Sequence, residues 1–261
     1  MSPEERLQLL ADDPRSAPFI KRYMGSAEAI NDGERYCLWI PEGSVAAARA
    51  ISAIESRLVR VASERSKSKA ASTVAYAAQP HRFVQISYKP TESILVPSIS
   101  SERRDYIPIG YVGPETVISN KGFAVYDAQP WVFGLLTSRM HMAWTNAVSG
   151  RMEMRYQYSN TIVYNNWPVP PLSNAVKEKL TAAALRVLDV REYHCERTLA
   201  QLYDPDLMPS DLRAAHADVD ALVDSIYSKR GYETDEQRLS DLFGMYEKMT
   251  ADEALNGGEK K

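Results

Sequence analysis

A proline-rich run about two-thirds of the way along the chain is the feature that most limits its fold. The segment WPVPPLS, residues 167–173, holds three prolines in four positions. Proline fixes φ and has no backbone N–H, so neither a helix nor a central strand continues through such a run. The sequence therefore predicts two parts, a first domain over 1–171 and a second over 172–261.

The first part has the pattern of a mixed domain. Ser2 followed by Pro-Glu-Glu is a strong helix start, because it offers a capping hydroxyl, a proline in the first turn and two carboxylates. Helices are expected over 44–69, which is rich in alanine and arginine, and over 138–150, where Gly150 would end the helix. Strands are expected where short apolar or alternating runs meet turn residues: at 35–40, across 81–136 (including Val84, Ile86 and Tyr88, and ending with WVFGLL at 131–136), and over 151–167.

The second part has helical periodicity. Apolar residues recur every three or four positions from Val176 to Val190 and again from Leu212 to Ile226. Thr234 and Gln237 form a capping box before a third such stretch. The fold class predicted is α+β, a mixed strand and helix domain followed by a small helical bundle.

Composition and charge exclude several protein classes. No run of about 18 apolar residues is present and the acidic start is not a secretory signal, so we expect no membrane partner. Cys37 and Cys195 are too few for a disulfide framework, which favours the cytoplasm. Residues 1–172 hold 19 Lys and Arg against 16 Asp and Glu, whereas 173–261 hold 12 against 18. A uniformly basic nucleic-acid binder is excluded, but a local basic surface on the first part is not.

Catalytic signatures are missing from the sequence. It has no G-x-G pair, no G-K-[ST] and no G-x-S-x-G, and its four histidines lack metal-ligand spacing. Its one E-x-K triplet lies in the tail, at 259–261. His141 lies among apolar residues and is expected to be buried and hydrogen-bonded. We therefore expect no catalytic residue, no metal and no covalent chemistry by this chain alone.

Two groups of cations are candidates for contacts with DNA phosphates, which arginine, lysine and hydroxyl groups bind without reading sequence. They are Arg57, Arg60, Arg65, Lys67 and Lys69 near the end of the 44–69 helix, and Arg103 with Arg104. The alternative is a solvated helix face for the first group, and ion pairs with Glu102 and Asp105 for the second.

The segment 150–167 has the most unusual pattern. Glu153, Arg155 and Gln157 alternate along an expected strand, so their side chains would share one face. Glutamate accepts from cytosine, arginine donates two bonds to guanine, and glutamine pairs with adenine. The pattern fits a base-reading edge, but the residues alone favour the alternative, a solvent-facing strand of an antiparallel sheet.

Several long segments resemble one protein family. SSERRDYIPIGYV and FGLLTSRMHMAWTNAVSGRMEMRYQYSNTIVYNNWPVP resemble the target recognition domain of MmeI-like (type IIL) restriction–modification enzymes. FIKRYMGSAEAINDGERYCLWI resembles the entry to that domain. LYDPDLMPSDLRAAHADVDALVDSIY and RLSDLFGMYEKM resemble the helical C-terminal domain of the same family. The resemblance covers roughly residues 19–249.

The resemblance implies a function. In this family of bacterial defence enzymes, one long chain carries an endonuclease, an adenine-specific (N6) DNA methyltransferase and a DNA-reading region. The family's base-reading positions match Glu153, Arg155, Gln157, Asn120, Lys121 and, through a less direct alignment, Glu102. The family's N-P-P-[FY] motif, donor-binding loop and D…E-x-K site are not in this sequence.

The expected function is therefore sequence-specific recognition of double-stranded DNA for an adenine-N6 methyltransferase. The S-adenosylmethionine of the full-length family enzyme would be bound by another portion, and this chain would hold no cofactor. The further partner would be a methyltransferase and endonuclease portion, if the enzyme is split. Two alternatives stay open: a methyltransferase acting alone, and a remnant that binds protein.

Overall fold

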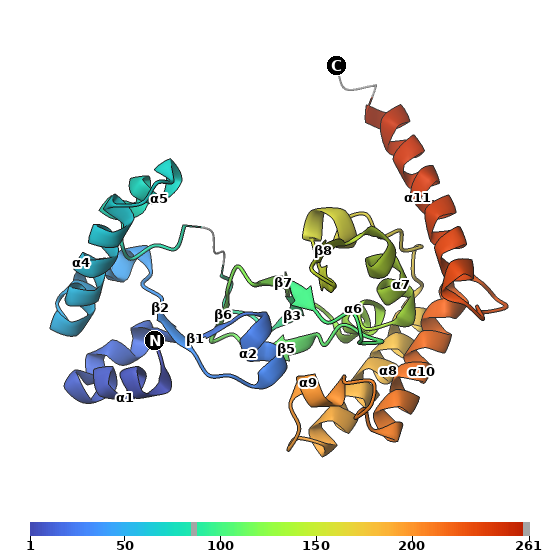
Figure 1. The fold of residues 1–261 in the computed structure, drawn as a ribbon, viewed down its shortest axis with the longest axis horizontal. Helices are drawn as coiled ribbons and strands as arrows, with labels where there is room; N and C mark the ends of the chain where they lie inside the picture. Colours follow the sequence, from blue (N-terminus) through green and yellow to red (C-terminus); the bar gives the residue numbers. More distant parts are fainter. Residues whose placement is uncertain (85–87, 258–261) are drawn as a thin grey trace.

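Two helical regions lie at opposite ends of the molecule, with small sheets between them (Figure 1). The structure, a computed structural model, describes residues 1–84 and 88–257, with side chains up to residue 251. The expected alternation of Val84, Ile86 and Tyr88 falls partly on 85–87, outside the described residues. Within the described part, no helix is long and apolar enough to cross a membrane.

The N-terminal helical region consists of α1 (Pro3–Asp12), η1 (Pro14–Phe19), η2 (Glu42–Ser44), α3 (Val45–Arg49), α4 (Ser52–Ser66), α5 (Ala71–Ala75) and η3 (Tyr76–Ala78). The helix start at Ser2 is confirmed: its hydroxyl accepts from the Glu5 N–H at 3.2 Å, and the Glu5 carboxylate accepts from the Ser2 N–H at 2.9 Å. The single helix predicted over 44–69 is wrong, because Ile51 has an extended backbone between α3 and α4. Ile51 is 2% exposed, and its burial in the core of this region offsets the interrupted helix.

The central part of the described chain forms three-stranded sheets. Their orders are β2-β1-β6, β5-β3-β7 and β4-β9-β8, and β1 with β6 is the parallel pair. The strands are β1 (Ile20–Met24), β2 (Tyr36–Leu38), β3 (Ser93–Pro97), β4 (Ile99–Ser100), β5 (Gly110–Val112), β6 (Thr116–Ile118), β7 (Gly122–Tyr126), β8 (Gly150–Met152) and β9 (Arg155–Gln157), with α2 (Ser26–Asn31) after β1. The strand predicted at 35–40 is confirmed as β2, whereas β1 was not predicted.

Three sequence predictions in this part are wrong in whole or in part. The run 131–136 lies in a helix, α6 (Pro130–Leu136), because Pro130 occupies the first turn and Phe133 to Leu136 are all buried against other helices. The segment 151–167 is extended only in β8 and β9, and is followed by a π-helix, η4 (Asn160–Tyr164). The predicted helix over 138–150 is α7 (Arg139–Val148), but Gly150 begins β8 instead of capping the helix.

The C-terminal part is the predicted helical bundle. It consists of α8 (Asn174–Tyr193), α9 (Leu199–Leu202), α10 (Ser210–Tyr227) and α11 (Asp235–Gly257). The first half of α11 packs against α7, and its far end projects from the molecule (Figure 1). The predicted α+β fold class is confirmed, with a mixed domain followed by helices.

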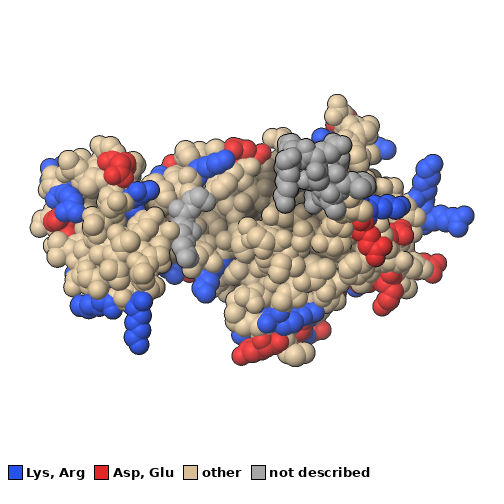
Figure 2. Space-filling view, turned by 90° about the horizontal axis from the view of Figure 1, so that it is seen from above, with Lys and Arg blue, Asp and Glu red and all other residues tan. Residues whose placement is uncertain are grey.

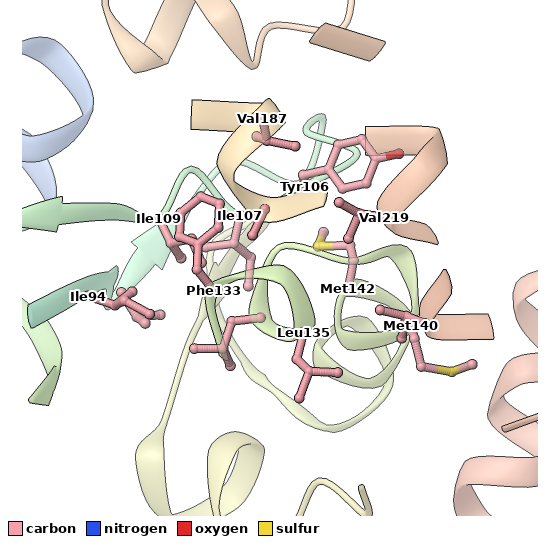
Figure 3. Close-up of a cluster of buried hydrophobic side chains, with 14 of the residues drawn as sticks. Ile94, Tyr106, Ile107, Ile109, Phe133, Leu135, Met140, Met142, Val187 and Val219 are labelled. Atoms are coloured by element: carbon pink, nitrogen blue, oxygen red, sulfur yellow. The ribbon is translucent and has the colours of Figure 1, made fainter. Parts of the chain in front are cut away.

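The largest core runs across the proline-rich segment. Side chains of β3, α6 and α7 pack together with those of α8 and α10, as Figure 3 shows for Ile94, Phe133, Met140, Val187 and Val219. A Cβ at Gly134 of α6 would lie 3.3 Å from the Leu180 carbonyl of α8, so the two helices approach closely. The helical bundle therefore supports the mixed domain directly.

Part-buried polar bonds also join the two parts. Asp220 of α10 accepts a hydrogen bond from the Tyr106 hydroxyl at 2.7 Å and another from the Arg139 backbone N–H at 2.6 Å. Arg139 pairs with Asp235 of α11 at 2.7 Å. Burial raises the pKa of Asp220 to about 6. These bonds hold the first turn of α7, and so the segment that leads into β8, against the bundle.

Candidate nucleic-acid interface

The β8–β9 hairpin presents the predicted base-reading strand to solvent. Met152 is paired with Arg155, and Gly150 with Gln157, so these four residues share one face. Arg155 and Gln157 are exposed, whereas Tyr156 between them is 6% exposed and faces the core. A buried tyrosine therefore anchors the strand while its two polar neighbours point outward.

Glu153 lies in the hairpin turn and not on the strand face, which corrects the expectation of three side chains along one strand. Its φ is +57°, a left-handed conformation that glycine adopts more readily than glutamate. The turn nevertheless brings its carboxylate to the Arg155 guanidinium, with an Oε2–Nη2 distance of 2.7 Å. Glu153 and Arg155 thus form one exposed acceptor–donor unit.

The Asn120–Lys121 turn lies close to the base of this hairpin. It connects β6 to β7, and both residues are exposed. Ser98 joins the two: its N–H donates to the Lys121 carbonyl at 3.3 Å, and its own carbonyl accepts from the Tyr158 N–H at 2.9 Å. The structure therefore brings together two groups of predicted base readers that are about 30 residues apart in the sequence.

Gly25 holds this turn from the other side. The Ser119 N–H donates to the Met24 carbonyl at 2.6 Å, and the Ser26 N–H donates to the Lys121 carbonyl at 3.0 Å. A Cβ at Gly25 would overlap Ser119 Oγ and lie 2.9 Å from Lys121 Cβ. The turn can pack this closely only because position 25 has no side chain.

The segment after β4 places the remaining predicted residues beside the bundle. Glu102 is half-buried, two residues beyond Ser100, whose strand partner is Tyr156. Arg103 pairs with Asp206 at 2.6 Å, not with Glu102 or Asp105. Burial lowers the pKa of Arg104, which donates to Ser100 Oγ at 3.5 Å. Arg103 and Arg104 therefore lie beside acceptors of the protein itself.

The cations of α4 lie in the N-terminal helical region, in the other half of the molecule from the hairpin (Figure 1). Arg65 donates to the carbonyls of Tyr76 and Gln79, both at 3.1 Å, and of Arg82 at 2.7 Å. This geometry assigns Arg65 to the support of its own region and not to a phosphate.

Of the other cations in this group, Arg57 is half-buried, and Lys67 and Lys69 follow the end of α4. Arg57 pairs with Glu5 at 3.6 Å and Lys67 with Glu64 at 2.8 Å, while Arg60 and Lys69 are exposed. Figure 2 shows lysine and arginine scattered over one face of the molecule with acidic residues among them, not gathered in one continuous patch. Any phosphate contact from this region would be separate from the hairpin.

Sequence reasoning missed three features of the hairpin. Arg151 lies over the Tyr156 ring, 4.1 Å from its centroid, and donates to the Asn146 side-chain oxygen at 2.6 Å. Arg151 is thus held at the hairpin edge, on the opposite face from Arg155. Met152 and Met154 are exposed, although their residue type is usually buried. The alternation around Arg155 was visible in the sequence, but no sequence signal marked these exposures.

The histidine expectation is confirmed for His141. It is fully buried, with Nδ1 2.7 Å from the Leu136 carbonyl and Nε2 3.0 Å from the Tyr158 hydroxyl. Burial lowers the pKa of His141 to about 4, so its ring is neutral at pH 7. Among the described residues, no group of three His, Cys, Asp or Glu side chains could hold a metal ion.

Taken together, the exposed groups suit recognition of a nucleic-acid groove. The major groove of B-DNA is about 12 Å wide and admits a two-stranded β-ribbon. The hairpin here offers glutamate and arginine side chains at or next to its tip and a glutamine at its base, near the turn that carries an asparagine and a lysine. This combination supplies both donors and acceptors to base edges.

Comparison with protein families divides the chain into two matches. Residues 1–171 match the model of the MmeI target recognition domain, and residues 172–254 match that of the MmeI C-terminal domain.

Two known proteins are similar over nearly the whole chain. DNA methyltransferase A of Bacillus subtilis (strain 168) is 40% identical over 237 residues, which are 91% of this chain and 27% of that protein. A solved structure of the type IIL restriction–modification enzyme MmeI in complex with DNA superposes with a TM-score of 0.92 at 37% identity. The match covers 96% of this chain and 34% of that one, so the chain spans about a third or less of either relative.

Proposed function

We propose a function from the premise that this chain belongs to the MmeI family, whose target recognition and C-terminal domains it contains. The chain recognises a specific sequence of double-stranded DNA and so selects the site at which an adenine-N6 methyltransferase acts. Its similarity to an enzyme solved in complex with DNA supports this function.

The observation that carries it is the exposed β8–β9 hairpin. Arg155 and Gln157 point outward from a strand that Tyr156 anchors, and Glu153 lies 2.7 Å from Arg155. Inserted into the major groove, Arg155 donates to guanine, Gln157 pairs with adenine and Glu153 accepts from cytosine. Asn120 and Lys121 approach an adjacent base pair from the neighbouring turn, and Glu102 lies beside the hairpin.

Phosphate contacts position the domain without specifying sequence. Arg57, Arg60, Lys67 and Lys69 of the N-terminal helical region would contribute such contacts at a distance from the hairpin. Arg103 and Arg104 would have to exchange their present partners for phosphate oxygens. Because these contacts release counterions, affinity falls as the salt concentration rises.

Methyl transfer belongs, in this proposal, to a portion that corresponds to the rest of the longer relatives. That portion binds S-adenosylmethionine and flips the target adenine out of the duplex. The C-terminal part of this chain, which carries the excess of acidic residues, is a surface for contact with it. The two portions together would form the restriction–modification enzyme.

The experiment is selection of binding sites from random duplexes by the full chain and by Arg155→Ala. We expect the variant to lose about 1–3 kcal/mol of discrimination at one base position and to keep the rest of the selected site. Arg186→Ala is the matched control, because Arg186 is similarly exposed and pairs with Asp218 at 2.6 Å on the helical bundle. Enrichment of the same site by the parent and by Arg155→Ala would show that Arg155 does not read a base.

Two further measurements separate the alternatives. A mobility shift with mixed duplexes at low salt should be positive, and its absence would favour a remnant that binds protein. Calorimetry of the chain with S-adenosylmethionine should give no binding heat, whereas a saturable heat would favour a methyltransferase that acts alone.

A further inference from the structure

The β8–β9 hairpin exposes two methionine side chains among its outward-facing polar residues. Met154, at the tip, is 70% exposed and Met152, in β8, is 39% exposed. Met140 and Met142 of the preceding helix α7 are 0% and 6% exposed and pack in the core. The exposure is therefore specific to the hairpin and not a general property of methionine in this protein.

The strand register places the methionines among the predicted base readers. Met152 is the cross-strand partner of Arg155, so both lie on the face that carries Gln157. Met154 follows Glu153 in the turn. A Cβ at Gly150 would lie 3.5 Å from Gln157 Oε1, so the Gln157 side chain extends over Gly150 on this face. On the outer face of the hairpin, the two methionine thioethers therefore lie on either side of the Glu153–Arg155 ion pair.

Resting on the proposed function, we propose that Met152 and Met154 contact the C5-methyl group of thymine in the major groove, next to the base pair contacted by Glu153 and Arg155. Among the four bases, thymine alone presents an apolar group on the major-groove edge. Methionine suits such a contact because its unbranched, polarisable side chain adapts to irregular surfaces. The polar pair fixes the ribbon on one base pair, and the thioethers cover the methyl group beside it.

The expected size of the effect follows from the area of one methyl group. Burying a group of this size contributes about 0.8 kcal/mol, which corresponds to about a fourfold change in affinity. The contact is therefore a modest addition to specificity, smaller than a bidentate hydrogen bond to a base.

The test replaces each thymine of the selected duplex in turn with uracil, which lacks only the C5-methyl group. The full chain should lose about fourfold in affinity at one or two positions adjacent to the base pair at which Arg155→Ala changes discrimination. The difference in affinity between the thymine and the uracil duplex should shrink in Met154→Ala and in Met152→Ala. It should be retained in Met154→Leu. Leu185→Ala is the matched control, because Leu185 is 44% exposed on α8 in the helical bundle.

Three results would overturn the inference while leaving the proposed function intact. They are uracil substitutions without effect on the parent chain, alanine variants that weaken binding equally to thymine and uracil duplexes, and a selected site with no thymine beside the position read by Arg155. Failure of the full chain to shift any duplex would instead overturn the proposed function, and this inference with it.

Discussion

Replacing Gly25 by alanine should change DNA recognition although Gly25 is not itself a predicted reader. Its φ of −128° suits alanine, so the effect is steric and not conformational. The new Cβ would overlap Ser119 Oγ and lie 2.9 Å from Lys121 Cβ, against about 3.4 Å for ordinary contact. The Asn120–Lys121 turn must therefore recede by at least roughly half an ångström, at an overpacking cost of about 1–3 kcal/mol.

Two assays measure the effect of Gly25→Ala on the Asn120–Lys121 turn. Denaturant unfolding should show a loss of stability of about 1–3 kcal/mol, and site selection should show relaxed discrimination at one base position only. Gly43→Ala is the matched control: a Cβ there meets nothing within 4 Å, so both readouts should stay at the parent values. If Gly25→Ala kept the parent's stability and its selected site, the packing argument for this turn would be refuted. A destabilised variant with an unchanged site would remove Asn120 and Lys121 from the base readers.

Three more outcomes are expected. Glu153→Gly removes the strain of a left-handed glutamate, but it also loses an exposed ion pair and makes the unfolded chain more flexible. The free energy of unfolding should therefore change by less than about 1 kcal/mol, while discrimination is lost at one base position. A large change in stability, measured by denaturant unfolding, would contradict this. Folding raises the pKa of Asp220, so the contribution of its protonated form to stability is lost as the pH rises from about 4 to about 6. The stability of the parent relative to Asp220→Asn should fall by about 2–3 kcal/mol over that range. A difference between the two proteins that stays constant with pH would refute the assigned pKa shift. Arg151 is exposed on the opposite face of the hairpin from Arg155, so we expect it to contact a phosphate and not a base. Arg151→Ala should therefore weaken binding equally to all duplexes and reduce the slope of log affinity against log salt by about 1. An altered selected site would instead make Arg151 a base reader.

Local patterns were sufficient for much of the fold. The helix start at Ser2, the strand at 35–40 and the three C-terminal helices follow from the chemistry of neighbouring residues, so the sequence alone predicted them. The predictions that proved wrong depended on packing. Pro130 starts a helix where an apolar run suggested a strand, because Phe133 and its neighbours are covered by other helices on several sides.

The candidate site likewise has features that local sequence patterns predict and features that depend on packing. The amino-acid sequence was enough to predict the hydrogen-bonding groups at 153, 155 and 157, the shared face of alternate positions, and the family that the chain resembles. The folded chain was needed to show that Glu153 occupies a left-handed turn, that Asn120 and Lys121 lie near the hairpin base through Ser98, and that two methionines are exposed. Strand periodicity acts between neighbouring residues, whereas exposure and proximity depend on contacts between residues tens of positions apart.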